Sequence, residues 1–527
     1  MRVNSRFLRF TAAGAVVAGS LALHATAFAA TYQVGPGKTY PDLGAVVDLL
    51  NPGDVVEVDG DHTYPGGVVF DRPGSPMANI TIRGIRINGK RPVLSGGTNT
   101  VEARANHYVF ESLDLTGGSS RCFYHHANDI VLRDSVVHDC PKQGILGADT
   151  ESGSFLLEYT EVHHCGGGTF DHQIYMATNE VDYPGSVFRM QHCYVHDGNG
   201  GNSVKSRAER NEIYYNWIEG AMYHELELIG PDPAGGVNEG VAREDSDVVG
   251  NVLRKRNTFA VVRFGGDGTG QSNGRYRFVN NTVVTFPNAS AVFRLFDGIE
   301  SLEAHNNVFF AIDAGTVNMV RQVEANWTTG QTLIAGSNNW TMNGTENIPP
   351  AWTGTILGAD PGFMNIGTDD LRLDMASPLV EAGATSLSGP PDHPFPDPLA
   401  VPLSHPPLHA VETSDAALPR PAAGVIDIGA YEFGVGGSGG AGGGAAGSGG
   451  GGSGSGGMGA TTGSGAVGGS GGAGGNGGSG GKDTSGEDSS EPSSCGCRTA
   501  STDRGTLVWL LSLVPLAAHA RRRSRRA

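Results

Sequence analysis

Short hydrophobic segments recur along the middle of the chain, each led by a small polar residue or an asparagine. Each has the form polar-x-(Val, Ile, Leu or Phe), and they begin at Ser135, Thr160, Cys193, Asn216, Asn251, Asn281 and Asn307. In the first six, a second short strand pattern follows about ten to fourteen residues later, at Ile145, Ile174, Val204, Leu226, Val262 and Phe293. The starting positions lie 23 to 35 residues apart. This spacing predicts one repeating unit built of short strands.

These segments do not fit helices, because they lack the 3.6-residue period and Gly, Asn and Asp interrupt every run. A β-sandwich is the competing interpretation, but it has no fixed repeat and prefers hairpin turns. The pattern favours a parallel β-helix, in which each coil pairs with its neighbours ~4.8 Å away. In such a coil the asparagines form an internal stack of side-chain amides, with a structural role only.

The two ends of this region resemble those of right-handed parallel β-helix proteins. Residues 31–56 are similar to the capping segment of that family, and residues 377–379 and 427–432 are similar to its closing segment. The resemblance implies an all-β chain with a single-stranded right-handed parallel β-helix over residues 31–433. Residues 311–400 contain fewer clean repeats, and we expect a last irregular coil and cap there.

Composition and charge narrow the function. The chain has 527 residues, of which 38% are hydrophobic, 17% are charged and 82 are glycines. So much glycine and so little charge exclude a coiled coil or a helical bundle. The formal net charge of −18 argues against a nucleic-acid-binding protein, which needs a basic surface. It leaves room for a local basic patch that binds an acidic substrate.

The N-terminus has the features of a secretory signal. Arg2, Arg6 and Arg9 precede an apolar stretch over residues 10–23, and Ala27-Phe28-Ala29 is a small-x-small cleavage site. The apolar stretch is short for a membrane span, so we expect a signal peptide over residues 1–30 and export of the protein.

The C-terminus combines a tether and an anchor. Residues 434–494 are rich in Gly and Ser and predict a disordered, flexible linker. Residues 495–527 contain Cys495 and Cys497, a short apolar segment and a terminal cluster of arginines. This order resembles the myxobacterial C-terminal sorting signal, which implies that one of the two cysteines anchors the protein at the outer cell surface or membrane. A plain tail-anchor helix is the alternative.

The spacing of two cysteines predicts a disulfide. Cys140 follows Val137 by three residues and Cys165 follows Val162 by three, so the two cysteines occupy one position on adjacent coils. The distance between neighbouring strands lies within the Cα range of a disulfide, and an exported protein can form one. We therefore predict a bond between Cys140 and Cys165. Cys122 and Cys193 occupy other positions in their coils, and the spacing assigns them no partner.

Alternation along the second strand predicts which side chains leave the core. With Val204, Leu226, Val262 and Phe293 directed inward, one outward face collects cations, carboxylates and polar groups from successive coils. These are Lys205, Arg207, Arg263, Arg294, Glu225, Glu227, Ser203, Gln173 and Tyr175. Like charges stacked at strand spacing destabilise a sheet unless an anion or a countercharge lies across them. A cationic groove of this kind suits an acidic polysaccharide.

Uronate polysaccharides are cleaved by β-elimination, in which a base removes the C5 proton and the C4 oxygen leaves. The adjacent carboxylate must first be neutralised by Ca²⁺ or by Arg and Lys side chains. We expect Lys205 to be the base, with its pKa lowered by neighbouring cations, and Arg207, Arg263 and Arg294 to complete the catalytic set. His172, Gln173 and Tyr175 are the expected substrate-binding residues, and Glu225 and Glu227 are candidate ligands for calcium.

Residues 202–207, Asn-Ser-Val-Lys-Ser-Arg, resemble the catalytic-base strand of β-helix polysaccharide lyases, the group that includes chondroitinase B and alginate lyases. The resemblance implies that Lys205 is the base. The family's Glu-x-Glu pair precedes its lysine, whereas this chain has residues 197–201, Asp-Gly-Asn-Gly-Gly, in that place. The comparable pair here is Glu225 and Glu227, one coil later.

Other interpretations of the same fold stay open. A glycoside hydrolase needs two carboxylates across the scissile bond, which Asp197, Glu219, Glu225 and Glu227 would supply. A non-enzymatic surface protein that binds glycans along the long face of the coil is the other alternative. His138, His163 and His196 share one predicted position on adjacent coils, where stacked surface imidazoles are favoured over a transition-metal site. We expect a monomer that binds acidic polysaccharide and no nucleic acid.

Overall fold

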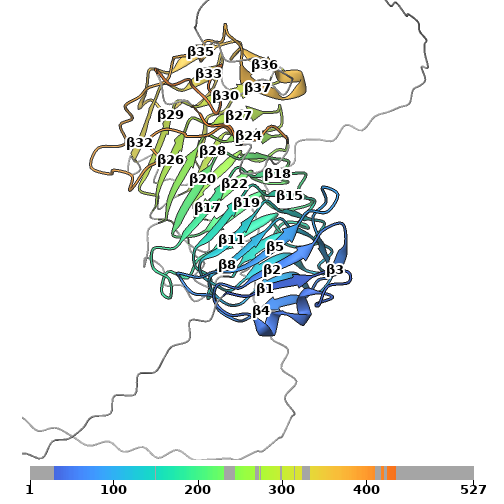
Figure 1. Cartoon of the computed structure of the whole chain (residues 1–527). Helices are drawn as coiled ribbons and strands as arrows, with labels where there is room; N and C mark the ends of the chain where they lie inside the picture. Colours follow the sequence, from blue (N-terminus) through green and yellow to red (C-terminus); the bar gives the residue numbers. More distant parts are fainter. Residues whose placement is uncertain are drawn as a thin grey trace, which may run out of the picture.

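The computed structural model describes residues 29–148, 150–230, 244–266, 272, 274–296, 299–313, 315–322, 333–409, 417–420 and 424–434. Nearly all of the predicted signal peptide, the Gly-rich linker and the sorting segment with Cys495 and Cys497 lie outside these residues. Within them, the chain forms a right-handed parallel β-helix whose coils stack along one axis (Figure 1). No helix in this part of the chain is long and apolar enough to cross a membrane.

Three parallel sheets form the sides of the coil, and we call them sheets A, B and C. Sheet A has 13 strands among the described residues, namely β1 (Thr31–Val34), β2 (Val55–Asp59), β5 (Ile80–Ile85), β8 (Tyr108–Glu111), β11 (Ile130–Arg133), β14 (Phe155–Glu158), β17 (Val187–Gln191), β20 (Arg210–Tyr214), β23 (Asp245–Val249), β26 (Arg275–Val279), β29 (Ser301–His305), β32 (Leu333–Ser337) and β34 (Trp352–Thr353).

Sheet B follows sheet A along each coil. Its 12 described strands are β3 (Thr63–Pro65), β6 (Val93–Ser95), β9 (Asp114–Thr116), β12 (Val136–His138), β15 (Glu161–His163), β18 (Tyr194–His196), β21 (Trp217–Glu219), β24 (Val252–Lys255), β27 (Thr282–Thr285), β30 (Val308–Ala311), β33 (Trp340–Met342) and β35 (Ile356–Gly358).

Sheet C closes the coil. Its ten described strands are β4 (Val68–Phe70), β7 (Asn99–Ala103), β10 (Arg121–His125), β13 (Ile145–Gly147), β16 (Ile174–Ala177), β19 (Val204–Arg207), β22 (Leu226–Ile229), β25 (Val262–Gly265), β28 (Phe293–Leu295) and β31 (Val320–Gln322). The second strand of each predicted repeat belongs to this sheet, and its inward residues lie in the core.

The tight turn from sheet A to sheet B carries the predicted asparagine stack. On successive coils, the first residue of this turn has a left-handed backbone conformation, for example Tyr215 at φ 56° and Asn280 at φ 53°. The next residue points into the coil: Asn251 Nδ2 donates to Asn281 Oδ1 at 3.0 Å and to the carbonyl of Ile213 at 2.8 Å. The same bonds link Asn216, Asn251, Asn281, Asn307 and Asn339. These side chains satisfy backbone groups that the turn would otherwise bury without partners.

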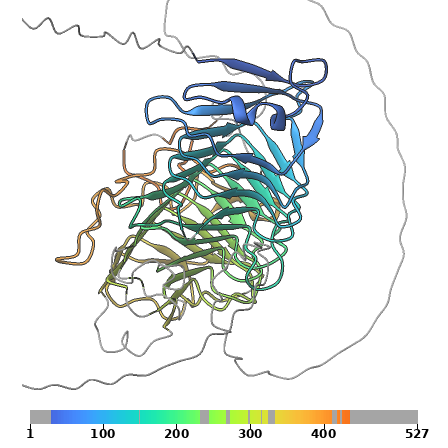
Figure 2. The same cartoon turned by 90° about the horizontal axis from the view of Figure 1, so that it is seen from below.

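The N-terminal end of the coil is covered. The 3₁₀ helices η1 (Leu43–Ala45) and η2 (Val47–Leu49), blue in Figure 2, lie beside the first coils. Leu43, Val46 and Leu50 of this segment are buried in the core. Towards the C-terminus the coils continue to β35, and the antiparallel pair β36 (Phe363–Asn365) and β37 (Asp370–Leu373), with η5 (Ile366–Thr368) between them, packs through Leu371 and Leu373 on outward residues of sheet B.

The chain then returns along the outside of the coil. Arg275 and Arg210 of sheet A donate to the carbonyls of Pro394 and Pro396, and the backbone N–H of Leu403 donates to Tyr215 Oη at 2.9 Å. Further on, the His409 ring lies 4.1 Å from that of Trp217. The orange segment of Figure 1 therefore crosses coils that are nearly 190 residues earlier in the sequence.

Candidate active site

On sheet C, the outward side chains of successive coils stack in register. Tyr175 pairs with Lys205, Lys205 with Glu227, Glu227 with Arg263, and Arg263 with Arg294. Arg321 continues the same line after Arg294. The structure thus brings Tyr175, Lys205, Glu227, Arg263 and Arg294 into the single column that the alternation predicts. We call this set the sheet C column.

Glu227 is the centre of the column. Its Oε1 atom lies 3.8 Å from Lys205 Nζ and 3.3 Å from Arg263 Nη1, and its Oε2 atom accepts a hydrogen bond from Asn202 Nδ2. Burial alone would raise the pKa of Glu227, but Lys205 and Arg263 reverse this effect and lower the pKa to about 2. The group is therefore a carboxylate at any working pH, and it supplies one negative charge for two cations.

Aromatic rings support the cations of the column. Lys205 Nζ lies 5.5 Å from the centroid of the Tyr175 ring, and Arg207 Nε donates to the Tyr175 hydroxyl at 3.1 Å. Arg263 and Arg294 both lie over the ring of Phe296, at 4.2 Å and 5.0 Å. Such contacts favour a cation that has lost its water. They fit the burial of Lys205 and Arg263, whose exposed fractions are 6% and 7%.

Asn202 connects the column to two buried histidines. Its backbone N–H donates to His172 Nδ1 at 3.0 Å, and its Oδ1 atom accepts from the backbone of His224 at 2.9 Å. Burial lowers the pKa of His224 to about 3, so this imidazole is neutral and its Nδ1 donates to the carbonyl of Ala260. Sequence reasoning assigned Asn202 and His224 no role. The position of Asn202 in the 202–207 motif was the available signal for it.

Three of the predicted outward residues turn inward instead. Backbone hydrogen bonds align Gln173, Ser203 and Glu225 with Val261 and Val292, which belong to the core. All three are fully buried at the corner between sheets B and C, so Gln173 is not available to a substrate there. Alternation fails at this point because the strand has not yet begun and the chain is still turning.

Glu225 faces a lysine rather than Glu227. It accepts a hydrogen bond from Ser203 Oγ at 2.9 Å and lies 3.5 Å from Lys255 Nζ, with both charged side chains fully buried. Burial raises the pKa of Glu225 and lowers that of Lys255, while each group opposes the shift of the other. The pair stabilises the corner and takes no part in the sheet C column.

The residues present do not fit the expected calcium site. Glu225 is neutralised by Lys255, and Glu227 is shared by Lys205 and Arg263. Calcium is held by six to eight oxygen ligands, usually with several carboxylates. Within the described ranges, no group of three or more His, Cys, Asp or Glu side chains is placed to hold a metal ion.

The disulfide differs from the predicted one. Cys140 is bonded to Cys122, with a Cα–Cα distance of 5.7 Å, whereas Cys165 and Cys193 are buried thiols. The prediction of a Cys140–Cys165 bond was wrong because equivalent positions on adjacent coils point in parallel, about 4.8 Å apart. A disulfide needs Cβ atoms about 3.8 Å apart and converging.

The predicted histidine stack exists on sheet B. His138, His163 and His196 are in register, and neighbouring ring centroids are 5.1 Å apart. Hydrogen bonds to Asp114 and Asp139 raise the pKa of His138 to about 9, against partial burial. Both ring nitrogens of His138 therefore serve as donors to carboxylates. His138 is therefore held in the stack by carboxylates on both sides.

Two buried carboxyl groups, Glu180 and Glu244, were not predicted from the sequence. Burial raises the pKa of Glu180 to about 7 and that of Glu244 well above its usual range, and Arg207 partly opposes the shift of Glu244. Both are almost fully buried, at exposed fractions of 3% and 1%. They lie in turns between sheets C and A, where neither alternation nor a repeat marks them.

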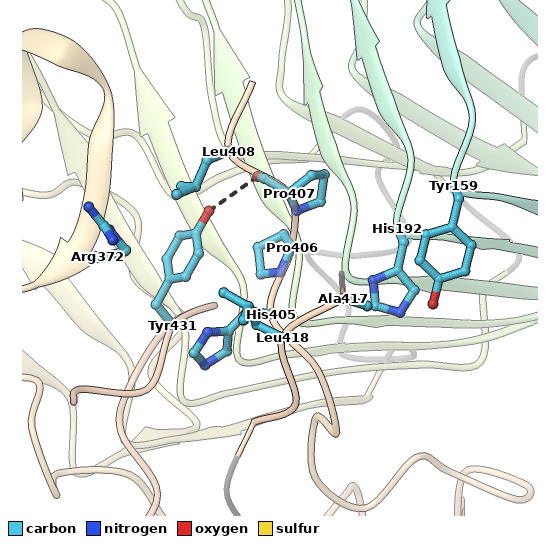
Figure 3. Close-up of a pocket in the computed structure, with 10 residues that line it drawn as sticks. All are labelled: Tyr159, His192, Arg372, His405, Pro406, Pro407, Leu408, Ala417, Leu418 and Tyr431. Atoms are coloured by element: carbon cyan, nitrogen blue, oxygen red, sulfur yellow. Dashed lines mark hydrogen bonds between the residues drawn. The ribbon is translucent and has the colours of Figure 1, made fainter. Parts of the chain in front are cut away.

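The returning C-terminal segment closes a small pocket against the corner of sheets A and B (Figure 3). Tyr159 and His192 line one side, their rings stacked at 4.7 Å, and residues 405–408 and Tyr431 line the other. The Tyr431 hydroxyl donates to the carbonyl of Pro407 at 3.4 Å. The cavity measures about 20 Å³, room for about one water molecule, so it is a packing seam rather than a ligand site.

No protein-family model matches the chain, and no curated protein is significantly similar to it. Solved structures similar to it include pectate lyase Pel9A, at 11% identity and a TM-score of 0.41, covering 76% of this chain and 96% of the other. An alginate lyase from Paenibacillus sp. str. FPU-7 matches at 14% identity and a TM-score of 0.30, covering 58% and 97%. The PL6 family polysaccharide lyase Pedsa3628 from Pseudopedobacter saltans matches at 13% and 0.32, covering 60% and 89%. The assignment of the fold rests on the strand pairing described above.

Proposed function

We propose that the protein is a polysaccharide lyase that cleaves uronate-containing polysaccharide by β-elimination at the sheet C column. The observation that carries the proposal is the in-register stacking of Tyr175, Lys205, Glu227, Arg263 and Arg294. Successive coils lie about 4.8 Å apart, so the column presents a phenol, an amine and guanidinium groups along one line on the scale of a sugar residue.

Each group has a defined role in this reaction. The guanidinium groups of Arg263 and Arg294 neutralise the uronate carboxylate, which makes the C5 proton acidic. Lys205, as the amine, accepts that proton; the C5–H electron pair forms the C4–C5 double bond, and the C4–O pair leaves with the oxygen. Tyr175 donates a proton to the leaving oxygen, and Arg207 Nε, already bonded to the phenol oxygen, stabilises the charge that develops there.

Glu227 holds the base in place. Because one carboxylate is shared by Lys205 and Arg263, it does not neutralise both cations. Glu227 fixes the position of the Lys205 side chain, and Arg263 contacts the same carboxylate oxygen from the next coil. Asn202 and His172 hold Glu227 and the adjoining turn from the other side.

A glycoside hydrolase is disfavoured by the same geometry. It needs one carboxyl group that donates a proton and a second carboxylate on the other side of the bond. The pKa of about 2 makes Glu227 unable to donate a proton, since it stays ionised, and Glu225 faces Lys255 within the corner. Calcium is not required in this scheme, because arginines perform the neutralisation.

The remaining expectations complete the proposal. The protein is exported by its N-terminal signal, is anchored at the outer cell surface through Cys495 or Cys497, and acts as a monomer on acidic polysaccharide. The Gly-rich linker gives an anchored enzyme a wide reach around the cell.

The test is ultraviolet absorbance of unsaturated uronates released from pectate, alginate and glycosaminoglycans, with Ca²⁺ and with chelator. Lys205→Arg is the decisive variant, because arginine keeps the charge beside Glu227 but does not deprotonate. We expect loss of activity in Lys205→Arg, retained activity in Lys90→Arg, whose lysine is a surface residue paired with Asp61, and no effect of chelator. A flat signal on all substrates contradicts the proposal. Reducing ends without unsaturation indicate a hydrolase, and binding without cleavage indicates a glycan-binding protein.

A further inference from the structure

An open groove lies on sheet B, outside the sheet C column. Phe286, Phe310 and Met342 form its floor, Ile366 of η5 forms one wall, and Arg254 and Arg256 lie at one end. Its volume is about 510 Å³, within the range of small-molecule sites in proteins. We call it the sheet B groove. Arg254 and Arg263 belong to the same coil, so the groove and the column flank one corner of the helix.

The floor presents aromatic rings to the groove. Phe286 and Phe310 are both half-buried; Arg254 and Arg256 lie over the Phe286 ring, so Phe310 is the ring available to a ligand. The Phe310 ring is fixed from behind by Trp340, at 6.4 Å, and by Phe363, at 6.1 Å. Ile366 is 36% exposed on the wall. A fixed apolar platform of this kind suits a flat ligand face made of C–H groups.

The end of the groove holds hydrogen-bonding groups. Arg254 is buried, with Nη1 2.5 Å from Glu219 Oε2 and Nη2 paired with Asp369. Its Nε–H is itself buried and has no acceptor among the described residues, so Arg254 fixes the end of the groove rather than offering this donor to a ligand. Arg256 lies 5.1 Å over the Phe286 ring, is 48% exposed, and adds further donors.

Charge decides the class of ligand. Arg254 and Arg256 are balanced by Glu219 and Asp369, and Asp313 at the rim adds one more carboxylate. The groove is therefore not cationic, in contrast to the sheet C column, and an acidic ligand would face excess negative charge. The groove thus has an apolar floor, hydrogen-bond donors and acceptors at one end, and no excess of positive charge. These properties suit a ligand that is a neutral, polyhydroxylated ring.

We propose that the sheet B groove binds a neutral sugar residue of a polysaccharide. The C–H face of the pyranose ring lies on Phe310, a hydroxyl accepts from the exposed guanidinium group of Arg256, and other hydroxyls donate to Asp313 and Asp369. This site goes beyond the proposed lyase activity and does not depend on it. It gives the protein a second contact with a cell-wall or matrix glycan on a different sheet.

The test is calorimetric titration of the full chain with cellohexaose, xylohexaose, mannohexaose and hexagalacturonate. All titrations use the Lys205→Arg background, so that no probe is cleaved. The groove variants are Phe310→Leu, which keeps an apolar side chain, and Arg256→Gln. The matched control is Arg104→Gln, because Arg104 is an exposed arginine paired with Glu102 on sheet C. Thermal unfolding of each variant checks that it folds.

We expect at least one neutral hexasaccharide to bind with a Kd below about 1 mM. Phe310→Leu and Arg256→Gln should each weaken this binding about tenfold, and Arg104→Gln should change it less than about twofold. The proposal is overturned if no neutral probe binds, or if neither groove variant changes the affinity. It is also overturned if hexagalacturonate is the probe whose binding Arg256→Gln removes. Retained neutral binding in a protein without lyase activity would refute the lyase alone.

Discussion

The ammonium group of Lys205 lies 3.8 Å from a carboxylate oxygen of Glu227, which is its register partner on the next coil. Arg263 approaches the same oxygen from the coil beyond, at 3.3 Å. One buried carboxylate therefore orders two cations. This relationship makes Glu227 the residue that holds the two cations of the column in place.

Replacing Glu227 by glutamine should destabilise the protein by about 3 kcal/mol. The variant leaves two buried cations without a countercharge, which costs far more than loss of a surface ion pair. Urea unfolding at pH 7 measures the change. The matched control is Glu111→Gln, since Glu111 pairs with Arg83 and Arg133 on the exposed face of sheet A and should lose less than about 1 kcal/mol.

The difference in unfolding free energy between wild type and Glu227→Gln should decrease as the pH falls. The folded pKa of Glu227, about 2, is below the unfolded value, so its stabilising effect is complete above about pH 4.5 and disappears as the pH falls towards 2. The gap between wild type and Glu227→Gln should narrow over that window. A gap that stays constant from pH 5 to pH 2.5 would mean that the carboxylate is not held by Lys205 and Arg263.

Glu180 should behave in the opposite way. Its folded pKa of about 7 is above the unfolded value, so the folded state binds the extra proton and stability falls as the pH rises from about 4.5 to 7. Glu180→Gln imitates the protonated form. It should be more stable than wild type by about 2 kcal/mol at pH 8 and nearly equal at pH 4. Equal melting temperatures at both pH values would contradict the burial of this carboxyl group.

Each asparagine of the internal stack should contribute to the free energy of unfolding. Asn251→Ala removes donors and an acceptor from a fully buried turn, so that Asn216, Asn281 and the Ile213 carbonyl each lose one hydrogen bond, and we expect a loss of about 3 kcal/mol. Denaturant unfolding provides the measurement, with Asn288→Ala in an exposed turn as the control. A loss below about 1 kcal/mol would show that water replaces the missing amide.

Peptide mapping without reductant should identify a Cys122–Cys140 crosslink, with Cys165 and Cys193 labelled only after unfolding. The bond closes a loop with a sequence separation of 18, so the double variant Cys122→Ala/Cys140→Ala should lose about 3 kcal/mol. Cys165→Ala should lose less, because it removes a small buried thiol alone. A Cys140–Cys165 crosslink in the map would refute this pairing.

The repeat and the register could be predicted because they recur once per coil. The small polar residue that begins each repeat marks the turn between sheets A and B, and alternation within β19, β22, β25 and β28 was enough to place Lys205, Glu227, Arg263 and Arg294 on one side. These features depend on local geometry that every coil shares, so they leave a repeating pattern in the sequence from which they can be predicted.

The features that sequence reasoning missed depend on turns. Gln173 and Glu225 precede their strands, where the chain changes direction and the two-residue period no longer applies. The carboxyl groups of Glu180 and Glu244 lie in turns of irregular length, and the returning segment that contacts Arg210 and Tyr215 has no repeat. Long-range packing of this kind leaves no periodic trace in the sequence.

The returning C-terminal segment also affects how the coil comes apart. A solenoid in which each coil touches only its neighbours frays from its ends, one coil at a time. Here the hydrogen bond from Arg210 to the Pro396 carbonyl joins positions 186 residues apart, and it links a middle coil to the chain beyond the last one. We therefore expect that the terminal coils do not detach without releasing the middle, so that this half of the molecule unfolds cooperatively and resists proteolysis from that end.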